Sequence, residues 1–249
     1  MNLFWLAKAA KECVKLMNDA HAGGGKMAME ATQSMYAALH VAGVQLDDDA
    51  YGITHSRHRL VRWLACHRSH MRLTLEFHIA ELFAEYECRQ PGKRHKTVLD
   101  GHVERLRHLI ETADLPNSLP DSDASPDEAA VMAWDAALTA KLSAKLTAKR
   151  NDPSNPANYT KTGRLKKRKH TPTPPLVLGT VDLPGKVRTI PLCMEKEFIV
   201  RDANGALRGI ASYLNYYRRD KLGGDSKVTT MRKYYGKAEW PEPFASMSA

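Results

Sequence analysis

The chain has 249 residues, of which 43% are hydrophobic and 26% are charged, and its formal net charge is +9. This is enough to bury a core in one large domain or two small ones. No apolar run reaches the roughly 18–20 residues that a membrane span needs, which excludes a helical membrane protein. No secretory leader is recognisable, and the four cysteines form no CxxC pair. We therefore expect buried thiols in the reducing cytoplasm, without a disulfide or a metal.

The positive charge is concentrated in one segment. Residues 141–170 contain ten Lys or Arg and one acid, so this segment alone accounts for the net charge. A local basic block is typical of contact with nucleic acid or another polyanion. A solvated tail that only aids solubility is the alternative. The DNA contacts predicted in this block are Arg164, Lys166, Lys167, Arg168 and Lys169.

Helical periodicity dominates the N-terminal half of the chain. Apolar spacing predicts helices over residues 3–17, about 26–41, about 57–87 and about 98–112. In the second of these, a buried stripe runs from Met27 to Val41, on a different face from Lys26 and Glu30.

The C-terminal half is less regular. "SPDE" predicts a helix start with Ser125 as N-cap, and this helix should reach about Lys149. Residues 151–175 lack periodicity and should be flexible before they meet a partner. Residues 176–192 are consistent with a short strand pair. Asn204-Gly205 is typical of a hairpin or of a loop before the helix predicted over 206–222.

These elements predict a mainly α protein with a compact helical domain, a flexible basic insertion and, as an option, one short β-hairpin. The predicted organisation is a helical core over 1–120, an Ala/Lys-rich helix with the basic insertion over 121–190, and a C-terminal part of the core over 191–249.

The first residues bear on chemistry. An apolar cluster over residues 3–6 follows Met1 directly, which would fix the terminal amine against the fold. An α-amino group has an ordinary pKa near 8, and a fixed, partly neutral amine is a competent Schiff-base nucleophile. A first helix that simply begins early is the alternative interpretation.

A second candidate region is "DAHAGGGKMAMEATQ" (19–33). It brings His21, Lys26 and Glu30 within a short stretch, and so offers an acid or base, a cation and glycines for close backbone approach. Lys26 is predicted to contact DNA. The alternative is a solvated glutamate on a polar helix face.

"THSRH" (54–58) places His55 and His58 three residues apart at a helix start. Because no spacing points to a third ligand, we favour phosphate or base contacts near the helix N-terminus over a metal site. No metal and no cofactor is therefore expected.

Two C-terminal segments, "YLNYYRRDK" (213–221) and "MRKYYGKAEW" (231–240), contain paired tyrosines flanked by Lys or Arg. Aromatic faces can stack on bases while Lys and Arg meet phosphates, although a Tyr-Tyr pair is also ordinary in a core. The predicted contacts are Tyr216, Tyr217, Arg218, Lys233, Tyr234, Tyr235 and Lys237.

The opening "MNLFWLAKAAKECVKLMNDAHAGGGKMAMEATQ", the "THSRH" segment, "YLNYY" (213–217) and "KYYGKA" (233–238) together resemble the phage-associated pyrimidine-dimer DNA glycosylase (endonuclease V-like) family. The resemblance covers about residues 1–112 and 191–244, and the basic insertion has no counterpart. It implies a compact all-α DNA-repair glycosylase with AP-lyase activity and no cofactor. The amine of Met1 would attack C1′ of a flipped nucleotide, with Glu30 as acid–base residue and His21 nearby.

The leading hypothesis is therefore a DNA-binding glycosylase/AP lyase for damaged or modified pyrimidines, in the cytoplasm of the host bacterial cell. A non-catalytic phage DNA-binding protein and a base-modifying enzyme are the alternatives. RNA stays open as the polymer, no membrane partner is expected, and the sequence leaves the oligomeric state open.

Overall fold

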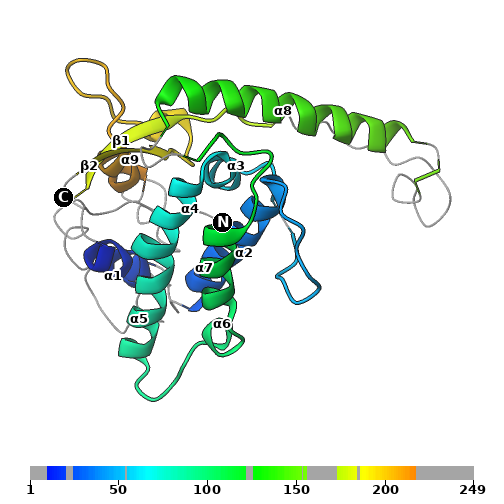
Figure 1. Ribbon diagram of the computed structural model, residues 1–249. Coiled ribbons are helices and arrows are strands. Elements are labelled where there is room, and N and C mark those ends of the chain that lie inside the picture. Colours follow the sequence, from blue (N-terminus) through cyan, green and yellow to red (C-terminus); the bar gives the residue numbers. More distant parts are fainter. Residues whose placement is uncertain are drawn as a thin grey trace, which may run out of the picture.

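The structure is a computed structural model. It describes residues 10–20, 25–53, 55–121, 126–152, 154–155, 173–183 and 186–216. These form helices and one two-stranded antiparallel sheet, which confirms a mainly α fold with a short β-hairpin. Figure 1 shows α8 lying along the top of a body made by the other helices, with the hairpin and α9 near its first half. No helix among the described residues has the length and apolarity of a membrane span.

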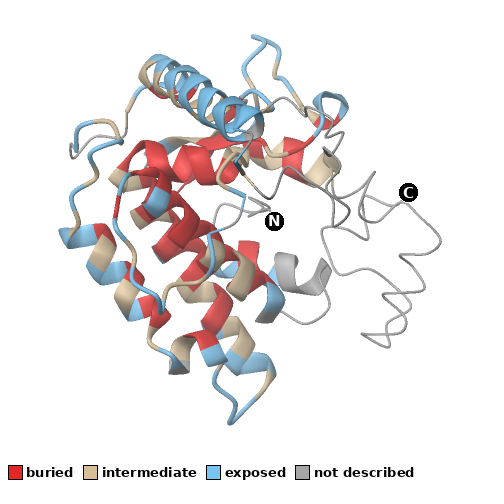
Figure 2. Ribbon diagram, turned by 90° about the vertical axis from the view of Figure 1, so that its right-hand side faces the viewer, coloured by how far each residue is buried: buried red, intermediate tan, exposed pale blue. Residues whose placement is uncertain are grey.

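The core begins with α1 (Ala10–Ala20) and α2 (Gly25–Val41). The predicted stripe of α2 is confirmed, since Met27, Ala31, Met35 and Ala38 are all buried. The α2 helix packs against α3, α5 and α7, and α1 packs against α5. Figure 2 shows the buried residues gathered in the middle of this body.

The single long helix predicted over 57–87 is wrong. The chain forms α3 (Arg59–Cys66), α4 (Arg68–Thr74), a π-helical segment η1 (Leu75–Ile79) and α5 (Ala80–Arg89). The break is at His67, whose backbone is extended (φ −155°, ψ 141°). Its Nδ1 accepts from the Ser69 amide, and its Nε2 lies 3.2 Å from the Pro120 carbonyl. A histidine thus ends one helix and caps the next.

The helix predicted over 98–112 is also two helices, α6 (Lys96–Leu99) and α7 (His102–Thr112). Gly101 separates them with φ +73°, a left-handed conformation that favours glycine. His95 caps α6 as His67 caps α4, because its Nδ1 accepts from the Thr97 amide at 3.2 Å.

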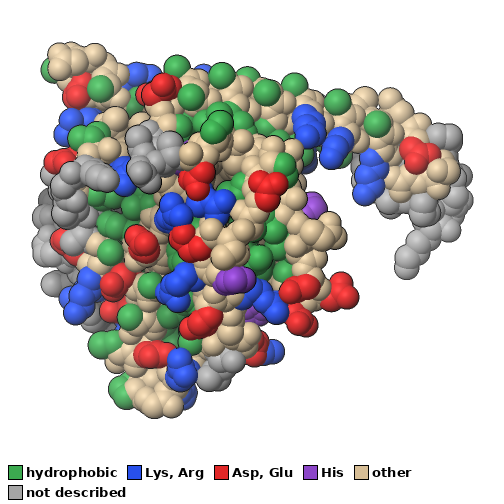
Figure 3. All heavy atoms as spheres, in the orientation of Figure 1, with side chains coloured by type: hydrophobic (Ala, Val, Ile, Leu, Met, Phe, Trp, Pro, Cys, Tyr) green, Lys and Arg blue, Asp and Glu red, His purple; other side chains and the backbone are tan. Residues whose placement is uncertain are grey.

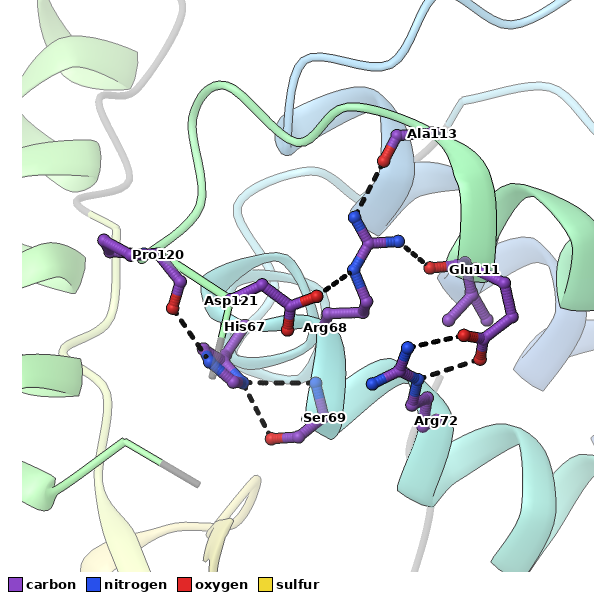
Figure 4. A network of polar contacts seen from close by, with 9 residues as sticks. His67, Arg68, Ser69, Arg72, Glu111, Ala113, Pro120 and Asp121 are labelled. Carbon is purple, nitrogen blue, oxygen red and sulfur yellow. Dashed lines mark hydrogen bonds and ion pairs between the residues drawn. The ribbon is translucent and has the colours of Figure 1, made fainter. Parts of the chain in front are cut away.

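A network of arginines holds the end of α7 against α4 (Figure 4). Arg68 donates to the carbonyls of Ile110 and Ala113 and pairs with Asp121 at 2.7 Å. Arg72 makes a two-pronged contact with Glu111, at 2.8 and 2.5 Å. Cationic side chains at the carbonyl end of a helix satisfy its last acceptors and its dipole.

The next helix, α8 (Glu128–Asn151), begins later than predicted. Its N-cap is Asp127, which accepts from the Ala130 amide at 2.7 Å, so the predicted Ser125 cap is wrong. Three buried or half-buried side chains of its first half, Val131, Asp135 and Leu138, face the body. Residues 144–149 are all exposed, and this end of α8 extends past the body.

The predicted strand pair is confirmed as β1 (Leu178–Leu183) and β2 (Lys186–Pro191), with Thr180 opposite Thr189. After a 3₁₀ turn, η3 (Lys196–Phe198), the chain forms α9 (Gly209–Tyr216). A Cβ on Gly209 would lie 2.7 Å from Val181 Cγ1, so glycine lets α9 approach β1 closely.

The cysteines were predicted to be buried thiols. Cys13 and Cys66 are buried, and Cys193 is half-buried, but Cys88 is exposed, which corrects that prediction. Cys88 lies in the last turn of α5, where that helix faces solvent.

Candidate functional site

The candidate site is built on His58, which caps the N-terminus of α3. Its backbone is extended (φ −68°, ψ 140°), and its Nδ1 accepts a hydrogen bond from the Leu60 amide at 3.2 Å. With Nδ1 used as acceptor, a neutral imidazole carries its proton on Nε2. The cap therefore fixes a ring that can donate from its other nitrogen.

His58 lies at a cavity of about 430 Å³, which we name the His58 pocket. Its walls come from the start of α3, from the segment between β2 and η3, and from the end of α9. The lining residues are His58, Arg59, Pro174, Cys193, Met194, Glu195, Glu197, Phe198 and Tyr216.

Arg59 joins two of these walls. Its Nη1 donates to the carbonyls of Leu192 at 3.1 Å and Met194 at 2.9 Å. The same wall is held from α9 by Tyr213, which donates to the Pro191 carbonyl at 2.5 Å and is fully buried. The pocket is thus shaped by side chains that lock the backbone of residues 191–194 in place.

The polar groups of the pocket differ in protonation. Burial lowers the pKa of His58 to about 4, with the positive charges of Arg59 and Arg62 acting in the same direction. Burial also raises the pKa of Cys193 to about 11. At neutral pH the imidazole is therefore uncharged and the thiol protonated, so Cys193 is a poor nucleophile. Glu195 and Glu197 are exposed carboxylates at the same pocket.

The structure brings together two of the residues predicted to contact DNA. His58 and Tyr216 come from "THSRH" and "YLNYY", far apart in sequence, and both line the His58 pocket. The rings of Tyr216 and Phe198 lie steeply inclined to one another, with centroids 5.2 Å apart and an interplanar angle of 73°. His55 is not among the lining residues, but it forms the turn before α3, with φ +60° and its carbonyl accepting from the His58 amide at 2.7 Å.

Glu30 and Lys26 lie elsewhere, on the first two turns of α2. Their side chains form an ion pair of 3.8 Å and are 24% and 76% exposed. Neither residue lines the His58 pocket. The structure therefore does not place Glu30 in one cavity with His58 and Tyr216.

The other predicted site residues lie outside the described part of the chain. They are Met1, His21, Tyr217, Arg218, Lys233, Tyr234, Tyr235 and Lys237, together with Arg164, Lys166, Lys167, Arg168 and Lys169.

Sequence reasoning missed Arg59 and the 193–198 wall. Arg59 directly follows the histidine motif, so its position at the helix start was a usable signal. No sequence signal marks residues 193–198, because they have neither periodicity nor a recognisable motif. Within the described ranges, no three His, Cys, Asp or Glu residues gather in an arrangement that could hold a metal ion.

Comparisons of the chain with protein-family models, with curated proteins and with solved structures gave no match. The resemblance seen in the sequence motifs therefore stays a prediction.

Proposed function

We propose that this protein binds DNA and excises a damaged or modified pyrimidine as a glycosylase with AP-lyase activity. The observation that carries the proposal is the His58 pocket, which joins His58 and Tyr216 at one cavity. Its volume of about 430 Å³ lies within the range of small-molecule pockets, so a flipped nucleotide is a fitting occupant. The setting we propose is phage DNA in the cytoplasm of a host bacterium.

The pocket offers complementary contacts to a base. The Tyr216 ring supplies an aromatic face for stacking, and neutral His58 supplies an N–H donor. Glu195 and Glu197 supply acceptors for the exocyclic and ring N–H groups of a base. These groups serve recognition of a base rather than of the phosphate backbone.

The chemistry we propose follows the family resemblance. The amine of Met1 attacks C1′ of the flipped nucleotide, the base leaves, and a protonated Schiff base forms. β-Elimination then nicks the strand, with Glu30 as acid–base residue and His21 nearby. Because the Lys26–Glu30 pair is partly exposed, it is weak, and Glu30 can exchange that partner for substrate at little cost.

Borohydride trapping tests the proposal. Incubation with DNA that contains an abasic site or a pyrimidine dimer should yield a covalent protein–DNA adduct after reduction. Acetylation of the N-terminus and Glu30→Gln should each abolish the adduct, whereas Glu104→Gln, an exposed position on α7, should not. An adduct that survives both changes, or no adduct at all, contradicts the lyase mechanism.

A base-modifying enzyme is the second candidate, favoured by one observation. His58, Glu195 and Glu197 provide acid–base groups at a pocket that neither Glu30 nor Lys26 lines. Mass spectrometry of nucleosides from treated DNA separates the two reactions, because excision removes a base and modification changes its mass. Binding without an adduct and without an altered nucleoside would indicate a non-catalytic DNA-binding protein.

A further inference from the structure

The inward face of α8 changes character along its length. At about 100° per residue, Trp134, Leu138, Lys141, Lys145 and Lys149 lie on one side of the helix. Trp134 and Leu138 pack against the body, and the three lysines are exposed. Lys and Arg side chains lie along the edge of the projecting helix that faces the hollow between helix and body (Figure 3).

The three lysines, Lys141, Lys145 and Lys149, form a row along α8. The first two line a groove of about 330 Å³ between α8 and the end of α2, which we name the α2–α8 groove. No carboxylate is among its described lining residues. Its polar lining residues are His40, Gln45, Ser56, Asn117, Lys141 and Lys145.

Asn117 satisfies carbonyls at the end of α2 whose partial negative charge would oppose an anion in the groove. A helix C-terminus carries partial negative charge on its last carbonyls. The Asn117 backbone amide donates to the Ala42 carbonyl at 3.0 Å, and its Nδ2 donates to the Val41 carbonyl at 3.4 Å. Its Oδ1 accepts from Lys141 Nζ at 3.4 Å. The acceptors of α2 are therefore occupied from within the fold.

A run of acids close in sequence to Gln45, residues 47–49, is partly neutralised. Asp47 and Asp49 pair with Arg105 at 3.2 and 3.6 Å. Among the described lining residues Lys141 and Lys145 carry positive charge and none is acidic, so the groove has a positive local charge, which attracts polyanions.

One short turn, residues 55–58, contributes a lining residue to both the groove and the His58 pocket. Ser56 lines the groove, and His58, two residues later, lines the pocket. A strand held in the groove would therefore pass next to the opening where a single base is recognised.

We propose that the α2–α8 groove and the row Lys141, Lys145 and Lys149 bind the phosphodiester backbone of DNA. Lysine is a point-charge ligand for phosphate, and successive lysines of the row are about 6 Å apart along the helix. Hydroxyl and amide side chains such as those of Ser56 and Gln45 are common partners of phosphate oxygens. The inference rests on the proposed function only in taking DNA as the polymer.

The test is fluorescence anisotropy of the full chain with a labelled 20-base-pair duplex over a range of salt concentrations. The variant is Lys141→Gln/Lys145→Gln/Lys149→Gln. The control removes three exposed lysines elsewhere, Lys11→Gln/Lys15→Gln/Lys96→Gln. The groove variant should bind roughly tenfold or more weakly, and its slope of log affinity against log salt should fall by about 2–3, since each lost phosphate contact removes about 0.9. The control variant should bind the duplex with an affinity within about twofold of that of the wild-type chain.

Ser56→Asp provides an independent readout, because it places a carboxylate in the groove without touching the lysines; it should also weaken binding. Wild-type affinity and slope in both groove variants would overturn the inference, while the borohydride adduct at saturating protein would leave the proposed function standing. Polyglutamate serves as a second probe in the same assay. If the triple lysine variant lost affinity for polyglutamate but kept its affinity for DNA, the inference would be overturned in favour of an acidic protein partner. If the wild-type chain binds no DNA, the inference and the proposed function both fail.

Discussion

Arg62 on α3 and Asp135 on α8 form an ion pair from which solvent is excluded. Their Nη1 and Oδ1 atoms are 2.7 Å apart, and the side chains are 0% and 6% exposed. Arg62 also donates to Thr139 Oγ1 at 2.5 Å and to the Pro174 carbonyl at 2.6 Å. One guanidinium thus holds α8 and the chain leading to β1 against the body.

Asp135→Ala should lower the free energy of unfolding by about 3–5 kcal/mol, because it leaves the Arg62 charge buried and uncompensated. Arg62→Met/Asp135→Leu should recover much of that loss, since it removes both charges. Urea denaturation measures each value. Arg72→Gln, which breaks the exposed pair with Glu111, is the control and should cost no more than about 1 kcal/mol. A cost for Asp135→Ala as small as the control would contradict a stabilising role for the buried pair.

Stability should fall when the solution is acidified. Burial is the main cause that lowers the pKa of His58 to about 4 and of His70 to about 3. His70 also stacks on Trp63, with ring centroids 4.2 Å apart. Because both folded-state pKa values lie below the unfolded value near 6.5, the unfolded chain binds more protons between these limits. Their stabilisation is complete above about pH 6.5 and is lost as the pH falls toward 4 and then 3.

Urea denaturation at pH 7 and pH 5 should show a loss of up to about 2 kcal/mol for each of these histidines. His70→Asn should be less stable at pH 7 but should show a smaller difference between the two pH values. His40→Gln, at an exposed position, should keep the wild-type difference. A wild-type stability that rises on acidification would mean that these imidazoles are charged in the folded chain.

The sequence allowed α2 to be predicted almost to its ends, because its apolar spacing matches the face that it buries. The breaks at His67 and Gly101 were missed for different reasons. Gly101 uses a left-handed backbone, which a single glycine in a helical pattern does not reveal. His67 depends on the Pro120 carbonyl, a partner distant in the chain.

In the candidate site, too, the local features were predictable and the long-range contacts were not. The histidine motif and the "YLNYY" segment predicted His58 and Tyr216 as contact residues, because short motifs show side-chain chemistry directly. Their common cavity was not predictable, since it depends on Arg59 reaching the carbonyls of Leu192 and Met194 across the fold. Spacing along the chain contains no information about such long-range contacts.

Tyr216 should affect DNA affinity through its ring. Tyr216→Ala should lower the affinity for DNA by roughly 5- to 150-fold, the range expected for loss of one stacked base. The salt slope should not change, because no charge is removed. Tyr216→Phe keeps the ring and should bind nearly as tightly as wild type. Anisotropy titrations give both quantities, and Tyr86→Ala on α5 is a control for removal of a half-buried tyrosine elsewhere.

Gly43 should tolerate no side chain. Its φ is +102°, and an added Cβ would lie 2.7 Å from Pro116 Cγ and 2.8 Å from Asn117 Nδ2. Gly43→Ala should therefore combine backbone strain with a steric clash and destabilise the fold by about 2–4 kcal/mol. Gly92→Ala is the matched control, because its φ is +79° but nothing lies within 4 Å of the added Cβ. Thermal or urea unfolding measures both variants. If Gly43→Ala and Gly92→Ala lost the same free energy of unfolding, the contact with Pro116 would have to relax without cost.

The exposed end of α8 has a consequence for hydrogen exchange. Residues 144–149 have no buried side chain, so these turns gain little from packing against the core, and a short helical end without such packing is only marginally stable in water. Their amides should exchange through local opening, whereas those of α3 should require unfolding of the core. A nucleic acid along Lys145 and Lys149 would therefore slow exchange at this end of the helix and report directly where the polymer lies.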